Sequence, residues 1–63
     1  MAHYYVMNEA KTYGRVIDAP SSWDARKTLA AACQASPFDF FAIRKDLMTD
    51  ISWKIWERIP NRG

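Results

Sequence analysis

The stretch SSWDARKTLAAACQA, residues 21–35, decides the fold that this sequence predicts. Ser21 is suited to cap the N-terminus of a helix, and Asp24, three residues on, completes a capping-box arrangement. The residues that follow are almost all good helix formers. Pro37 disfavours helical angles at the residue before it, so we expect the helix to end near Ala35.

One face of this helix is expected to be buried, and most of its side chains are small. The expected buried face comprises Ala25, Leu29, Ala32 and Cys33, and the opposite face comprises Asp24, Lys27, Ala31 and Gln34. A helix face with such small side chains should pack close against a surface with large side chains, such as a sheet carrying Tyr, Phe and Trp. Cys33 is therefore predicted to be a core residue rather than a reactive thiol.

Three other segments are rich in aromatic and β-branched residues, which predicts β-strands. They are residues 3–8, residues 15–19 and residues 40–45. Gly14 precedes the second of these segments and Pro20 ends it. The stretch between the first two segments is short and polar, so we expect a hairpin there.

The last apolar segment, residues 51–59, fits two structures. As a strand it places one set of side chains on each face: Ile51, Trp53, Ile55 and Ile59 on the first, and Ser52, Lys54, Trp56 and Arg58 on the second. As a helix its Ile and Trp residues sweep one broad apolar arc. The density of Ile and Trp favours the strand.

The element order that results is β-β-α-β-β. It predicts an α+β fold of two layers, with a four-stranded antiparallel sheet and one helix on one face. Residues 1–63 then form a single small domain. The alternative, in which the C-terminal segment is a second helix, stays open.

Composition excludes several classes of protein. The 63 residues are 49% hydrophobic, which is too apolar for a disordered tail, and nine basic against seven acidic residues give a net charge of only +2. One cysteine excludes a disulfide framework and a multi-cysteine zinc site. No apolar run is long enough to span a membrane, and the N-terminus lacks a signal-peptide pattern. We therefore expect a cytoplasmic protein that does not contact membranes.

Catalytic signals are weak throughout. His3 is the only histidine and lies near the chain terminus, which is a poor place to hold a general base. The carboxylates are scattered singly, without the spacing of a metal site, and no glycine-rich phosphate loop is present. We expect no enzyme, no cofactor and no metal ion.

The apolar side chains outnumber what one helix with a small-residue face can cover. Some of them should therefore face outward, where an apolar patch marks a protein contact. The sequence predicts a non-enzymatic protein-interaction module that binds another protein or a second copy of itself through an aromatic sheet face or an edge strand. Its length fits the compact proteins that phages encode, so a small regulatory, inhibitory or minor structural phage-type protein is the expected kind.

The whole basic surplus lies in residues 40–63. If residues 51–59 form a strand, aromatic and basic side chains share the outward face of a second hairpin. The predicted partner-binding residues on this face are Phe40, Arg44, Lys54, Trp56 and Arg58. Interleaved aromatic and basic side chains on an open sheet also bind single-stranded nucleic acid, so an RNA- or DNA-binding domain is the alternative function.

Overall fold

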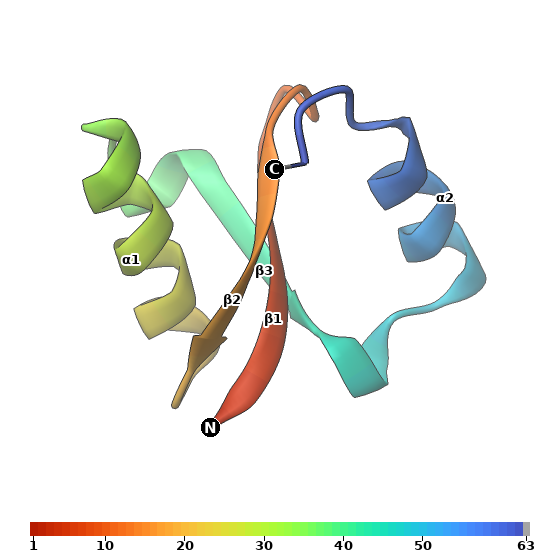
Figure 1. Cartoon of the computed structure of the whole chain (residues 1–63), viewed down its shortest axis with the longest axis horizontal. Coiled ribbons are helices and arrows are strands. Elements are labelled where there is room, and N and C mark those ends of the chain that lie inside the picture. Colours follow the sequence, from red (N-terminus) through yellow and green to blue (C-terminus); the bar gives the residue numbers. More distant parts are fainter. Residues whose placement is uncertain (63) are drawn as a thin grey trace.

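The computed structural model has an α+β architecture in which a three-stranded antiparallel sheet lies between two helices (Figure 1). It describes residues 1–62; Gly63, the last residue of the predicted single domain, lies outside the described residues. The sheet, in the order β2-β1-β3, consists of β1 (Ala2–Asn8), β2 (Gly14–Ala19) and β3 (Phe40–Arg44). The helices are α1 (Ser22–Cys33) and α2 (Asp50–Arg58), and two 3₁₀ turns, η1 (Pro37–Asp39) and η2 (Lys45–Leu47), flank β3. The three predicted strands are confirmed to within one residue at each end.

The central strand β1 is covered on both of its faces. Its side chains alternate, so that Val6 packs toward α1 whereas Tyr5 and Met7 pack toward α2. Both neighbours run antiparallel to it, and Tyr5 lies opposite Val16 of β2 and Ile43 of β3. The sheet therefore needs an apolar cover on each side, and the chain supplies one helix for each.

The prediction of a fourth strand at residues 51–59 is wrong, because this segment forms α2. Thr49 caps the helix: its hydroxyl accepts a hydrogen bond of 3.1 Å from the backbone N–H of Ser52. Asp50 in the first turn and Arg58 in the last turn both have the sign that the helix dipole favours. With α2 on the second face of the sheet, the predicted second hairpin and the predicted two-layer arrangement do not exist.

The N-terminus of α1 matches the prediction. The hydroxyl of Ser21 accepts a 3.2 Å hydrogen bond from the backbone N–H of Asp24 and donates one of 2.7 Å to its carboxylate. This second bond holds the pKa of Asp24 below its ordinary value of 3.8. The helix ends at Cys33, and Gln34 follows in the left-handed conformation with φ of 54°.

The predicted buried face of α1 is correct for only part of its length. Ala25 and Leu29 are buried, but Ala32 and Cys33 are exposed, and Ala30 is buried instead. The face that meets the sheet is rotated toward Ala30, and Cys33 lies in the last turn of the helix. Cys33 is therefore a surface residue, which corrects its assignment to the core.

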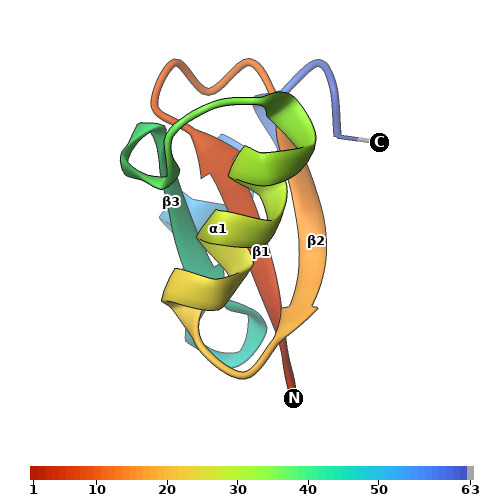
Figure 2. The same cartoon turned by 90° about the vertical axis from the view of Figure 1, so that its left-hand side faces the viewer.

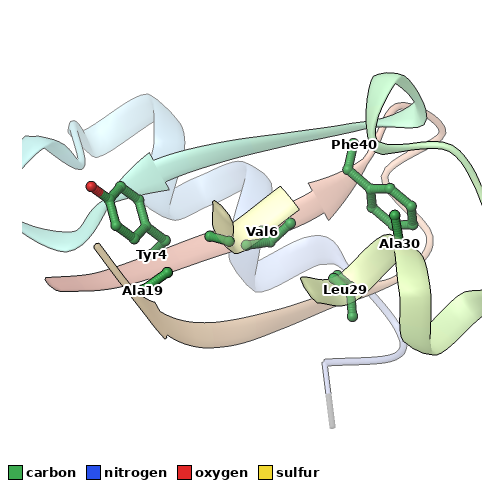
Figure 3. Packing of buried hydrophobic residues seen from close by; sticks show 7 residues of the cluster. Tyr4, Val6, Ala19, Leu29, Ala30 and Phe40 are labelled. Atoms are coloured by element: carbon green, nitrogen blue, oxygen red, sulfur yellow. The ribbon is translucent and has the colours of Figure 1, made fainter. Parts of the chain in front are cut away.

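Two separate apolar clusters fill the two faces of the sheet. The α1-side cluster, shown in Figure 3, consists of Tyr4, Val6, Ala19, Ala25, Leu29, Ala30 and Phe40. The α2-side cluster is centred on Met7, Trp56 and Ile59, with Tyr5, Phe41, Ile43, Met48, Trp53 and Ile55 packed around them. Much of the apolar surplus seen in the sequence is therefore absorbed by the second cluster.

A glycine allows Trp56 to reach the sheet. A Cβ added at Gly14 would lie 2.6 Å from the indole ring of Trp56, and real Cβ atoms do not approach other atoms so closely. The N–H of Gly14 donates a 2.9 Å hydrogen bond to the carbonyl of Asn61. The chain after α2 thus returns to the outer edge of β2, where Tyr13 and Asn61 form a single parallel bridge.

Candidate interaction surface

The five predicted partner-binding residues do not share one face of the molecule. Phe40 is 5% exposed in the α1-side cluster, and Trp56 is 7% exposed in the α2-side cluster. Arg44 is exposed at the end of β3, and Lys54 and Arg58 are exposed on α2. The set is split for two reasons: residues 51–59 form a helix instead of a strand, and Phe40 lies on the face of β3 that α1 covers.

A different group of aromatic and basic side chains meets on the surface beside α1. The rings of Trp23 and Phe38 lie 5.4 Å apart between centroids, at an angle of 53°. The guanidinium of Arg26 lies 5.0 Å from the ring of Trp23, and its Nε donates a 3.3 Å hydrogen bond to the carbonyl of Pro37. Trp23 is 40% exposed and Phe38 is 72% exposed. We call Trp23, Arg26 and Phe38 the Trp23 cluster.

The Trp23 cluster connects α1 to η1, the turn that leads into β3. In the view of Figure 2, β3 and the turn before it lie on one side of α1 and β2 lies on the other. Arg26 holds η1 by its hydrogen bond to the backbone, while its charge lies over the indole ring. An exposed pair of rings is thereby held in place next to the outer edge of the sheet.

The outer edge of β3 carries backbone groups that point away from β1. The N–H of Asn8 bonds to the carbonyl of Tyr13, and the N–H of Glu9 bonds to the carbonyl of Asp39. Along an antiparallel strand, successive residues point their backbone N–H and carbonyl groups to alternate sides. These two bonds therefore fix the side to which each residue of the ladder points its backbone groups. In β3, Phe41 and Ile43 bond to β1, whereas Phe40, Ala42 and Arg44 point outward. The ladder with β1 therefore leaves the backbone N–H and carbonyl of Ala42 without a partner in the sheet.

A shallow depression of about 320 Å³ lies on the α1 side of this edge. It is lined by Tyr4, Ser22, Ala42, Ile43, Arg44 and Leu47. Leu47 is 63% exposed, so the wall of the depression continues the apolar surface at the far end of β3 from Phe38. The edge therefore has an exposed ring at its start and a hollow with a mixed polar and apolar lining at its end.

A second, larger depression of about 600 Å³ lies on the other side of Arg44. Its lining surface is mostly apolar, although the lining residues include His3, Lys45 and Asp46 beside the half-buried ring of Trp53. His3 is in contact with Asp18, the residue opposite it in β2.

Arg44 and Asp46 neutralise each other at the junction of the two depressions. The guanidinium donates hydrogen bonds of 2.6 and 2.9 Å to the two carboxylate oxygens. This bidentate pair lowers the pKa of Asp46 below its ordinary value. Since Arg44 already has an anionic partner, it is a weak site for a phosphate group.

Trp23 and Phe38 were missed as candidates in the sequence, although part of the signal was there. Trp23 lies off the Ala25–Leu29 face of the helix, so its ring has no place in the core on that side. Arg26 follows three residues later, which is the spacing of surface neighbours on a helix. The contact with Phe38 depends on the course of η1, which no local pattern specifies.

Neither a metal centre nor a membrane span is found in the part of the chain that the structure describes. Residues 1–62 contain no group of three or more His, Cys, Asp or Glu side chains that could hold a metal ion. Of the helices within the same residues, none is both long and apolar enough to cross a membrane. Comparison with protein-family models, with curated proteins and with solved structures finds no match for this chain.

Proposed function

We propose that this chain is a non-enzymatic protein-interaction module that binds its partner through the outer edge of β3 and the Trp23 cluster. The observation that carries the proposal is the exposed contact between the tilted rings of Trp23 and Phe38, which Arg26 holds beside a strand edge whose backbone groups point outward. Trp and Arg are the residue types most enriched in the hot spots of protein interfaces.

The arrangement also supports an edge strand, rather than a sheet face, as the binding element. Helices cover both faces of the sheet, so only its edges can meet another protein (Figure 1). At the β2 edge, the N–H of Gly14 is occupied by Asn61. The β3 edge is flanked by large apolar side chains that are exposed to solvent, and an edge of this kind favours strand addition.

The alternative of single-stranded nucleic-acid binding loses much of its support. It relied on Phe40 and Trp56 stacking with bases on an open sheet, and both side chains are buried against helices. Of the nearby cations, Arg44 is paired with Asp46 and Arg26 lies over Trp23. The alternative is kept as an outcome of the test below.

Affinity capture with matched variants tests the proposal. The tagged chain and two variants, Trp23→Ala/Phe38→Ala and Ile51→Ala, are used as bait in cells that produce the chain naturally. Ile51 is the matched control because it is an exposed apolar residue, 71% accessible, on the other side of the molecule. Each captured protein is then purified and its affinity for the three chains is measured by titration calorimetry.

We expect the double variant to weaken binding of the purified partner at least tenfold, whereas Ile51→Ala leaves it unchanged. Equal binding by all three chains would contradict the proposal. In parallel, the anisotropy of a labelled mixed-sequence oligonucleotide is measured at two salt concentrations. Tight oligonucleotide binding that weakens steeply with salt would favour the nucleic-acid alternative instead.

A further inference from the structure

We propose that the partner of the β3 edge is a second copy of this chain, bound by antiparallel pairing of the two β3 strands about a two-fold axis at Ala42. This inference rests on the proposed function, since it names the partner of the same surface. It follows from three properties of the edge, each of which is complementary to itself under that rotation.

The first property is the direction of the backbone groups. The N–H and carbonyl of Ala42 both point outward, so Ala42 can exchange both hydrogen bonds with its counterpart in the second copy. In the same register, Arg44 lies opposite Phe40. The N–H of Phe40 is already bonded to the carbonyl of Pro37, but its carbonyl is free to accept from the N–H of Arg44 in the other copy. The small side chain of Ala42 lets the two strands approach at the axis.

The second property is the pattern of side chains along the edge. Pairing about Ala42 brings Ile43 beside Phe41 of the second copy, on the face that α2 covers, so two apolar residues meet there. Just beyond the two ends of β3, Lys45 at the start of η2 comes near Asp39 at the end of η1 of the second copy. The two-fold axis repeats this pair of opposite charges, and the register places no like charges directly opposite each other.

The third property is the fit of a projecting ring to a hollow. Phe38, at the start of β3, is 72% exposed on the α1 side, and the 320 Å³ depression lies on the same side at the end of β3. A two-fold axis at Ala42 exchanges the two ends of the strand. It therefore carries Phe38 of each copy to the depression of the other, beside Leu47. Two exposed apolar side chains that the monomer leaves in water, Phe38 and Leu47, would then cover each other.

The same operation at the other edge of the sheet gives a poorer match. Pairing of two β2 strands about Val16 would require Gly14 to bond to Asp18 of the second copy. The N–H of Gly14 already bonds to Asn61, whose segment lies along this edge. The β3 edge is therefore the one that a second copy fits.

The test measures self-association of the full chain and of a proline variant at each edge by sedimentation equilibrium. Ala42→Pro removes an outward N–H from β3 without removing a bond to β1, which is where a strand tolerates proline. Val16→Pro is the matched control, because it removes an outward N–H from β2. Circular dichroism checks that both variants are folded. We expect the wild-type chain and Val16→Pro to form dimers with a dissociation constant on the order of 10 μM, and Ala42→Pro to weaken the dimer at least tenfold.

A second pair of variants tests the ring and its hollow. Phe38→Ala should also weaken the dimer at least tenfold, whereas Ile51→Ala should leave it unchanged. A wild-type chain that stays monomeric at on the order of 100 μM overturns the inference, whereas the proposed function stands if a different protein is captured through Trp23 and Phe38. A dimer that Phe38→Ala weakens and Ala42→Pro does not would keep the surface but exclude strand pairing. A dimer that only Val16→Pro weakens would overturn both the β3 surface and the strand pairing as the basis of self-association.

Discussion

The two faces of the sheet are covered by helices that solve the same packing problem with side chains of opposite size. α1 meets the sheet through Ala25, Leu29 and Ala30, so its backbone lies close to the strands. α2 meets it through Trp53 and Trp56, and Figure 1 shows its ribbon further from the sheet. The spacing of each layer is set by the volume of the side chains in it, because protein interiors are packed to a nearly constant density.

The two faces also divide the aromatic rings between them. On the α2 side, Tyr5 makes edge-on contacts with both Trp53 and Trp56, at 5.0 and 4.8 Å between centroids. On the α1 side, Trp23 is partly exposed and its ring contacts that of Phe38 at an angle of 53°. The α2 side packs its tryptophans against the sheet, and the α1 side leaves its tryptophan partly exposed to solvent. Four predictions test this division.

The largest effect is expected from Trp56→Ala. It removes the ring that spans the space between α2 and the sheet and should destabilise the fold by about 3–5 kcal/mol, which is most of the stability of so small a domain. Thermal unfolding followed by circular dichroism measures it. Lys54→Ala, on the exposed side of the same helix, should change the free energy of unfolding by less than about 0.5 kcal/mol. Equal effects from the two variants would mean that α2 does not pack as described.

Enlarging the α1 contact should be the next most costly change. Ala30 is 1% exposed, and Ala30→Leu forces extra volume into the close contact between α1 and the sheet, at a cost of about 1–3 kcal/mol. Ala31→Leu adds the same atoms to the exposed side of the helix and should have little effect. Urea unfolding of both variants makes the comparison. If the two leucines are tolerated equally, the close packing of α1 is not what limits side-chain size there.

Gly14→Ala should cost about 1–2 kcal/mol, because the new methyl group collides with the ring of Trp56. The cost should shrink when Trp56 is already replaced by Leu, which a double-mutant cycle measures as a coupling energy. A cost that is the same with and without the indole ring would place its cause in the backbone of β2 instead.

The smallest effect concerns the two helix caps. The α1 cap includes an ionisable group, since Ser21 bonds to Asp24, whereas the α2 cap is made by the hydroxyls of Thr49 and Ser52. The pKa of Asp24 is lowered in the folded chain, first by the hydrogen bond from Ser21 and then by Lys27. The stabilisation from Asp24 is therefore fully present above the unfolded value of 3.8 and is lost as the pH falls through the lower folded value.

NMR chemical shifts of the first turn of each helix, followed from about pH 5 to about pH 2, measure this difference. The first turn of α1 should loosen before that of α2. Asp24→Asn should remove the pH dependence of the α1 cap, because the amide does not ionise in this range. An unchanged titration of the α1 turn in that variant would assign the transition to another group.

The sequence predicts the parts of this fold that depend on local chemistry. Ser21 and Asp24 identify the start of α1, and dense aromatic and β-branched residues identify the three strands. The second helix was predicted only as the alternative, because periodicity fits both structures and the density of Ile and Trp favoured the strand. The cap at Thr49, with Asp50 in the first turn, was a local signal that favoured the helix.

The strand Tyr4-Tyr5-Val6-Met7 held a second signal. It shows no alternation of apolar and polar residues, which is the pattern of a strand buried on both faces. Such a strand requires a second cover for the sheet, and residues 51–59 were the only apolar segment left to provide it. The candidate site was harder to predict, because the contact between Trp23 and Phe38 joins two elements through the path of a turn.

The return of Asn61 to the edge of β2 bears on how far a sheet of this kind can grow. A sheet with two open edges is a template for endless addition of strands, and the product is a fibre. Here Asn61 blocks strand addition at one edge, because its carbonyl accepts a hydrogen bond from the outward N–H of Gly14. In the proposed dimer, strand addition at the β3 edge would end after one step, because the two β3 edges cover each other. Truncation before Asn61 would leave the N–H of Gly14 open at the β2 edge and make the chain prone to form fibrils.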